Sequence, residues 1–105
     1  MHILIVKFHS GLAESEVQQL LHQRLPAVSA TPGLLQKHYT REALTGDYIG
    51  VHVFDSEKSL ECFRNSELSR SLPHVYQTTA QPRVEVLEVF LQLRPEVEES
   101  RARAM

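Results

Sequence analysis

The chain is poor in cysteine and has no tryptophan. Cys62 is the single cysteine among 105 residues, so one chain can form neither an internal disulfide nor a cysteine metal cluster. We interpret Cys62 as a small apolar residue of a helix, because unpaired cysteines are usually buried. A reducing, cytoplasmic setting is therefore the expectation.

Long apolar runs and an excess of one charge are also missing. The opening segment MHILIVKFHS is apolar, but it is too short for a signal sequence, and no run approaches the ~20 apolar residues of a membrane span. Eleven Lys and Arg stand against 13 Asp and Glu, and the basic residues are scattered. We expect a soluble protein with no membrane and no nucleic-acid partner.

Changes in hydrophobic period divide residues 1–94 into six elements. Short β-rich runs predict strands at 3–9, 34–41, 48–54 and 84–93. A period of 3.6 predicts one helix that ends near Pro26, and another that is capped by Ser56, weakens at Asn65 and ends at Pro73. The order βαββαβ predicts a single α+β domain of ferredoxin-like type, with a four-stranded antiparallel sheet and two helices on one face. Residues 95–105 are predicted to be a polar C-terminal tail.

Two helices cover only one face of such a sheet, yet alternate residues of the strands form two largely apolar sets. The first set contains Leu4, Val6, Phe8, Ile49, Val51, Val53, Leu87 and Val89. The second contains Ile3, Ile5, Lys7, His9, Tyr48, Gly50, His52, Phe54, Val84, Val86, Glu88 and Phe90. Because even the mixed second set is too apolar for a solvated face, we expect a second sheet to cover it in a homodimer.

Three segments resemble a known superfamily. They are PGLLQKHYTRE, DYIGVHVFDSEKSLECFRNSEL and PRVEVLEVF, and the resemblance spans about residues 3–93. They are similar to the dimeric α/β-barrel superfamily, and most similar to its antibiotic biosynthesis monooxygenase branch and related small monooxygenase-like proteins. The resemblance implies a homodimer whose two sheets face each other, with a pocket between each sheet and its own helices. Members include cofactor-free oxygenases of quinols and polyketide phenols, haem-degrading enzymes, and proteins of no known activity.

The candidate catalytic residues are histidines. None of the six histidines lies two or four residues from another, so we expect no metal site, unless separate strands assemble one. Lys7, His9, His52 and Glu88 belong to one alternating set and could converge. His52 beside a carboxylate could then act as a general base. Alternatively, these residues form a buried polar network that fixes the register of the dimer.

His74 is a further candidate, since it follows the second helix, where some haem-binding relatives place an axial histidine. The alternative is a histidine on a surface loop. The chain also lacks Trp and has Lys7 and His9 where the haem-degrading enzymes use an amide side chain, so the sequence departs from their pattern. An aromatic ligand would be bound by four aromatic residues, Tyr48, Phe54, Phe63 and Tyr76.

Two functions remain open. In the first, the protein is a cofactor-independent monooxygenase of a small aromatic or quinol-like substrate. His52, with His9 or His74, removes a proton, and the resulting anion passes an electron to dioxygen. In the second, it is a non-catalytic dimeric α/β barrel that binds a small hydrophobic ligand or has a stress-related role. The lack of Trp and of a compact catalytic motif favours the second.

Overall fold

The computed structural model describes residues 1–94. Its elements, in chain order, are β1 (His2–Phe8), α1 (Glu14–Ser29), β2 (Leu34–Arg41), β3 (Tyr48–Phe54), α2 (Glu57–Arg64), α3 (Glu67–Arg70), α4 (Leu72–Val75) and β4 (Arg83–Glu88). The predicted order is confirmed, with the second helical region divided into three short helices. The predicted tail at 95–105 lies outside the described residues.

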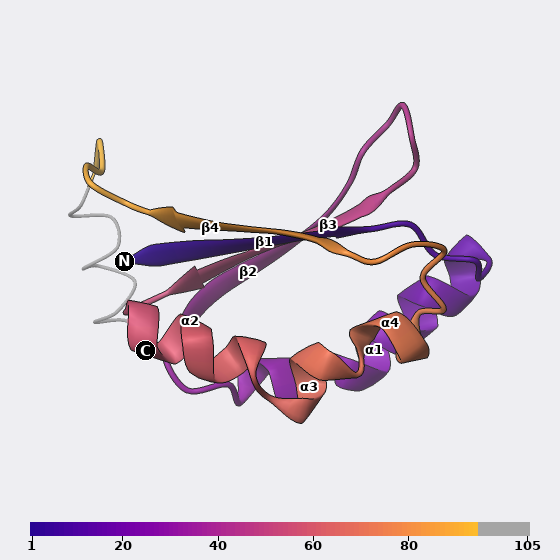
Figure 1. Ribbon diagram of the computed structural model, residues 1–105, viewed down its shortest axis with the longest axis horizontal. Coiled ribbons are helices and arrows are strands. Elements are labelled where there is room, and N and C mark those ends of the chain that lie inside the picture. The colour runs from indigo at the N-terminus through magenta and orange to yellow at the C-terminus, as the bar shows by residue number, and fades with distance from the viewer. Residues whose placement is uncertain (95–105) are drawn as a thin grey trace.

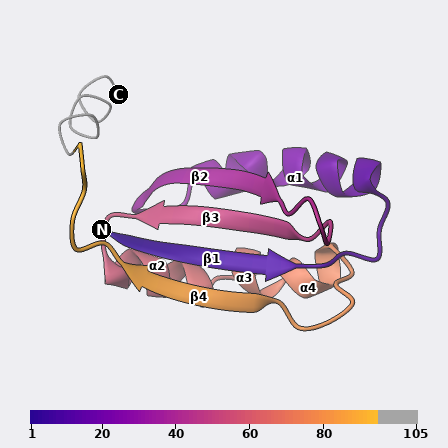
Figure 2. The same cartoon turned by 90° about the horizontal axis from the view of Figure 1, so that it is seen from above.

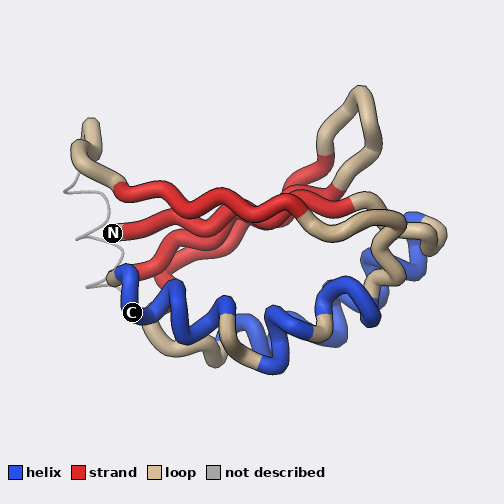
Figure 3. Tube along the Cα trace, in the orientation of Figure 1, coloured by secondary structure: helices blue, strands red, loops and turns tan. Residues whose placement is uncertain are grey.

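The four strands form a sheet in the order β2-β3-β1-β4, and every neighbouring pair is antiparallel (Figure 2). Both β3 and β4 therefore flank β1, as a ferredoxin-like topology requires. The helices form a second layer on one side of the sheet (Figures 1 and 3). Figure 2 shows α1 near the β2 edge, whereas α2 to α4 lie beneath β1 and β4. The predicted α+β architecture is confirmed.

Strand register decides which residues face the helices. Leu4 of β1 pairs with His52 of β3, and Ile5 pairs with Val51. Since paired residues point to the same side of a sheet, the helix-covered face combines even-numbered residues of both strands. These residues are His2, Leu4, Val6, Phe8, Tyr48, Gly50, His52 and Phe54.

The opposite side of the sheet is called the open face here. It contains Ile3, Ile5, Lys7, Ile49, Val51 and Val53, together with Leu87 of β4. The grouping expected from the sequence is therefore wrong, because it assigned Leu4 and His52 to opposite faces. Alternation along one strand carries no information about its register with the next strand, and a shift of one residue exchanges the two faces.

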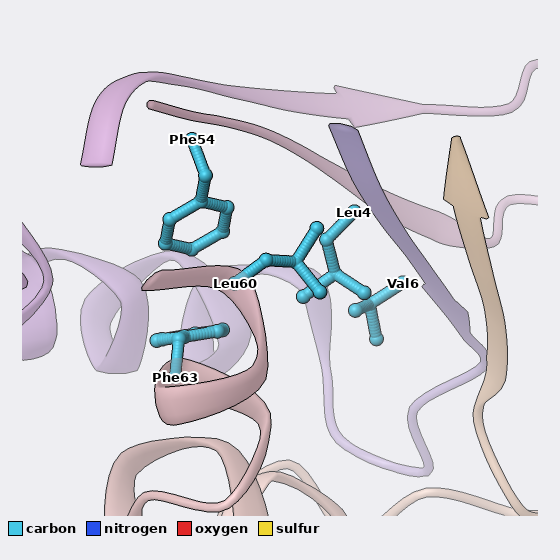
Figure 4. Packing of buried hydrophobic residues seen from close by; sticks show 5 residues of the cluster. All are labelled: Leu4, Val6, Phe54, Leu60 and Phe63. Carbon is cyan, nitrogen blue, oxygen red and sulfur yellow. The ribbon is translucent and has the colours of Figure 1, made fainter. Parts of the chain in front are cut away.

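The hydrophobic core lies between the sheet and the helices. Leu4 and Val6 of β1, Phe54 of β3, and Leu60 and Phe63 of α2 form one buried cluster (Figure 4). Burying each such side chain contributes roughly 1.5–3 kcal/mol, so this cluster fixes α2 against the sheet.

A second buried cluster lies at the other end of β1. It consists of Phe8, Val17 of α1 and Tyr76, which follows α4. The half-buried Leu72 packs against both clusters and so links them.

The predicted helix cap at Ser56 is confirmed, and a glycine marks the turn into β2. The side chain of Ser56 accepts a hydrogen bond from the Ser59 amide, 3.1 Å away, and so begins α2. Gly33 has a φ of 78°, and a Cβ there would collide with the Ser59 side chain. Glycine is therefore required at this turn into β2.

Both expected proline stops are wrong. Pro26 lies inside α1, which continues to Ser29, and Pro73 lies in the first turn of α4. Near a helix C-terminus a proline removes only one backbone hydrogen bond, and burial of Val28 in the following turn offsets that loss. Proline in the first helical turn removes an amide that has no partner within the helix anyway.

The last strand is shorter than expected. β4 ends at Glu88, opposite His2, the first residue of β1, and the Val89 amide donates one further hydrogen bond to the Met1 carbonyl. Phe90 is consequently 94% exposed. Within residues 1–94 no helix is long and apolar enough to cross a membrane.

Candidate functional site

A cavity of about 60 Å³ lies between the helix-covered face of the sheet and α1 to α4. Val6 and Phe63 of the first core cluster and Phe8 and Tyr76 of the second are among its lining residues, so it lies where the two clusters meet. Most of its wall is apolar. Small-molecule sites have this character: a concave apolar surface with a few polar groups.

His52 is the buried histidine of this cavity, with 3% of its surface exposed. Its Nδ1 lies 3.1 Å from the carbonyl oxygen of Leu4 on the neighbouring strand. A carbonyl only accepts, so Nδ1 carries the proton and donates it to this bond. Burial, and then the nearby Lys37 ammonium, lower the pKa of His52 to about 4. The ring is therefore neutral at pH 7, with the lone pair on Nε2.

Within residues 1–94 no side-chain hydrogen bond uses this lone pair. Nε2 also does not belong to the group of fully buried nitrogens that have no hydrogen-bond partner. His52 therefore offers a hydrogen-bond acceptor to a molecule in the cavity.

Aromatic rings surround the imidazole. Its centroid lies 5.1 Å from that of Phe63 and 6.2 Å from that of Phe54, to which it is nearly parallel. At the other end of the cavity, Phe8 contacts Tyr48 and Tyr76, with centroids 5.6 and 5.2 Å away. Flat walls of this kind favour a planar ligand.

Two cations also line the cavity. Lys37 of β2 pairs with His52 across the sheet, and its Nζ lies 4.4 Å from the centre of the Tyr39 ring. Burial, and then repulsion from Arg24, lower the pKa of Lys37 to about 8. Burial also raises the pKa values of Tyr39 and Tyr76, so both phenols stay neutral at pH 7.

The Arg24 side chain extends from α1 to the cavity, where hydrogen bonds with α3 and the residue after it hold the guanidinium in place. Its Nη2 donates to the Leu68 carbonyl, 2.5 Å away, and its guanidinium lies 3.3 Å from the Ser71 hydroxyl. The guanidinium carbon lies 5.7 Å from the Tyr76 ring centre. These contacts fix the position of its charge.

Gly50 makes room for both His52 and Lys37. A Cβ at position 50 would lie 3.0 Å from Cε1 of His52 and 3.4 Å from Cε of Lys37. A side chain at Gly50 would therefore displace the imidazole or the lysine stem from its present position.

The expected convergence of Lys7, His9, His52 and Glu88 is wrong. Lys7 lies on the open face, where it contacts Glu42 and Asp47, while His52 lies on the covered face. His9 follows β1, and its Nδ1 is 2.8 Å from Asp47 rather than near His52. Glu88 lies at the far end of β4, opposite His2.

Of the other expected site residues, some line the cavity and others do not. His74 is exposed on α4 and does not line the cavity. Tyr48, Phe63 and Tyr76 do line it, and Phe54 contacts His52 and Phe63 from the core. Of the histidine candidates, the structure thus places only His52 with the aromatic residues. Within residues 1–94 no three His, Cys, Asp or Glu side chains gather as they would to hold a metal ion.

Sequence reasoning missed Lys37, Tyr39 and Arg24. The available signal was the alternation of residues along β2, which places Lys37 and Tyr39 on the same face of the sheet. Arg24 carried no local signal, because it stands near a helix C-terminus, where a basic residue is expected on electrostatic grounds alone.

Comparisons with known proteins identify other proteins that have the same fold as this chain. No protein-family model matches the chain, and no curated protein matches it. Solved structures do match: Rv0793 from Mycobacterium tuberculosis is 19% identical with a TM-score of 0.70, over 88% of this chain and 97% of that one. A candidate antibiotic biosynthesis monooxygenase from Deinococcus radiodurans is 14% identical with a TM-score of 0.71, over 89% and 96% of the two chains.

SnoaB from Streptomyces nogalater, a cofactor-independent oxygenase, is 11% identical with a TM-score of 0.70, over 88% of this chain and 95% of SnoaB. The chain shares their fold. The suspected resemblance to the antibiotic biosynthesis monooxygenase branch is thereby supported at the level of architecture. At these identities, activity has to be argued from the site itself.

Proposed function

We propose that the protein is a cofactor-independent monooxygenase of a small aromatic or quinol-like substrate. The observation that carries this proposal is the neutral, buried imidazole of His52, which offers Nε2 to a cavity walled by aromatic rings. The shared fold with a cofactor-independent oxygenase adds support.

Because the cavity of about 60 Å³ is smaller than an aromatic ring, the lining side chains move apart to admit the substrate. The ring then lies against Tyr48, Phe63 and Tyr76, and a ring hydroxyl donates a hydrogen bond to Nε2 of His52. The Lys37 ammonium and the Arg24 guanidinium favour the ionised form of the substrate. As the anion forms, Nε2 accepts the proton. The new negative charge offsets the repulsion from Lys37 that otherwise disfavours a charged imidazole.

Dioxygen then reacts with the electron-rich anion. One electron passes from the anion to dioxygen, and the two radicals combine to form a carbon–oxygen bond. The resulting hydroperoxide loses water to leave a ketone or quinone. One oxygen atom enters the product. The other leaves as water with the hydrogen of the oxidised ring carbon and the proton first taken from the ring hydroxyl, and the substrate supplies every electron.

A homodimer is part of this proposal. The open face carries Ile3, Ile5, Val51 and Val53 next to the exposed Leu87. On the same side of the sheet, the β2–β3 loop and the segment after β4 project away from the helices (Figure 1). They carry Leu44, Phe90 and Leu91, which are largely exposed. A second copy laid against this face would cover all of these side chains.

One observation favours the alternative function, a non-catalytic barrel that binds a small hydrophobic ligand. A histidine with a pKa of about 4 is a weak base, and proton transfer to it is unfavourable unless the substrate itself is acidified in the cavity. Binding without turnover would need no such transfer.

Oxygen consumption separates the two functions. Purified protein is mixed with a panel of quinols and polyphenols, and uptake is compared with autoxidation. His52→Ala is the test variant. His74→Ala is the matched control, because His74 is exposed and does not line the cavity. Uptake that disappears in His52→Ala and persists in His74→Ala supports the oxygenase. Binding of the same compounds without uptake supports the non-catalytic barrel.

A further inference from the structure

The cavity carries positive charge without an acidic partner. Lys37 and Arg24 both line it, and none of its lining residues is Asp or Glu. None of the ion pairs within residues 1–94 involves either cation. The two charges are close enough for Arg24 to lower the pKa of Lys37. Both side chains are half-buried, and cations withdrawn from water normally have a counter-ion, because desolvation of an unpaired charge is costly.

Both cations also keep donors for a ligand. Arg24 bonds to the Leu68 carbonyl and the Ser71 hydroxyl through its terminal nitrogens, whereas a guanidinium has five N–H groups. The Lys37 ammonium has three donors, and no side-chain hydrogen bond within residues 1–94 uses them; its contact is with the face of Tyr39. A single acid group between these two side chains could accept from both.

We propose that the ligand of this cavity is an aromatic acid whose carboxylate pairs with Lys37 and Arg24 while its ring lies against the aromatic wall. This deepens the proposed function, on which it rests for turnover, by naming a hydroxyaryl carboxylate as the substrate class. The carboxylate supplies the missing counter-charge, and the ring hydroxyl faces Nε2 of His52. The largely apolar remainder of the cavity suits one compact charged group on a flat ring.

Calorimetric binding of benzoate and benzamide tests the charge requirement. The two probes have nearly the same shape and differ in charge, and neither has a ring hydroxyl to oxidise. At pH 7 we expect benzoate to bind at least about tenfold more tightly, the effect of one well-placed, partly desolvated charge pair. Lys37→Met should remove most of this preference, because it should weaken benzoate binding far more than benzamide binding. Lys58→Met, an exposed lysine on α2 that does not line the cavity, should behave like the wild type.

The pH dependence gives a second test. The charged and titratable groups that face Lys37 are Arg24, His52, Tyr39 and Tyr76. Among these groups and Lys37 itself, Lys37 is the one expected to change charge between pH 7 and pH 9. Benzoate affinity should therefore fall as the pH rises through about 8. In Lys37→Arg it should stay level over this range, because a guanidinium keeps its charge.

Equal affinities for the two probes, no binding of benzoate, or an unchanged preference in Lys37→Met would overturn the inference. These outcomes are distinct from failure of the oxygenase proposal. A strong benzoate preference without any oxygen uptake would contradict the oxygenase alone. Uptake with neutral quinols, without a preference for acids, would contradict the carboxylate site alone.

Discussion

The Nδ1–H of His52 donates to the backbone carbonyl of Leu4, 3.1 Å away, on the strand with which β3 pairs. The two residues are directly opposite in the sheet, so the bond depends on the strand register and not on a flexible side chain. It fixes the tautomer and leaves the lone pair on Nε2 of a residue that lines the cavity. The remaining chemistry of the candidate site is arranged around this nitrogen.

Acid should destabilise the protein partly through His52. The pKa of this ring is about 4 in the folded chain, against 6.5 for an unperturbed histidine. Between these values the unfolded chain binds a proton that the folded chain excludes. Stability from this residue is therefore fully present above pH 6.5, falls by up to ~1.4 kcal/mol per pH unit below it, and is lost by about pH 4.

Urea unfolding at several pH values measures this effect. The free energy of unfolding of His52→Gln should depend less steeply on pH between 6.5 and 4 than that of the wild type. His74→Gln, which changes an exposed histidine, should keep the wild-type slope. Parallel curves for the wild type and His52→Gln would contradict the buried neutral imidazole.

Lys37→Met should stabilise the free protein at pH 7 by roughly 1 kcal/mol, because it replaces a half-buried, repelled cation with an apolar side chain of similar length. The wild type should approach the variant as the pH rises from about 8 toward 10.5. In that range the folded chain has released the Lys37 proton and the unfolded chain still holds it. Thermal unfolding across this pH range tests both statements. A less stable Lys37→Met would indicate that the ammonium stabilises the fold.

Gly50→Ala should impair the site more than the fold. The new methyl group would press on the His52 ring and the Lys37 stem, and such overpacking costs about 1–3 kcal/mol. We expect weaker ligand binding and a modest loss of stability. Gly33→Ala is the comparison. Alanine there would have to adopt a φ of 78° and would collide with Ser59, and neither Gly33 nor Ser59 lines the cavity. This variant should therefore lower stability without a specific effect on ligand affinity in the folded fraction. Unchanged binding by Gly50→Ala would argue against a tightly packed His52.

Val51→Lys should separate the proposed homodimer into monomers. Val51 lies in the middle of the open face, opposite Ile5, and a buried charge there would have no partner across the interface. Sedimentation velocity should detect a dimer for the wild type and a monomer for the variant. Gln19→Lys adds the same charge to the exposed side of α1 and should leave the dimer intact. A monomeric wild type would refute the dimer directly.

Much of the fold was predictable because its signals are local. The change of period from two to 3.6 predicted the order of strands and helices, and Ser56 marked a helix cap by its own chemistry. The stop at Pro26 failed because burial of Val28 outweighs one missing hydrogen bond, and the stop at Pro73 failed because a proline in the first turn of a helix removes no intrahelical bond. The end of β4 failed because a strand ends where its partner ends, which the residues of β4 do not encode.

For the site, the sequence by itself determined a candidate histidine and the aromatic residues, but it did not single out the two cations. Only the tertiary structure decided which of them meet. The register of β3 on β1 placed His52 on the covered face and Lys7 on the open one. The packing of α1 brought Arg24 to a lysine 13 positions further along the chain. Such contacts join residues remote in sequence, and the choice between two sheet faces depends on the packing of the whole core, so no local pattern could reveal them.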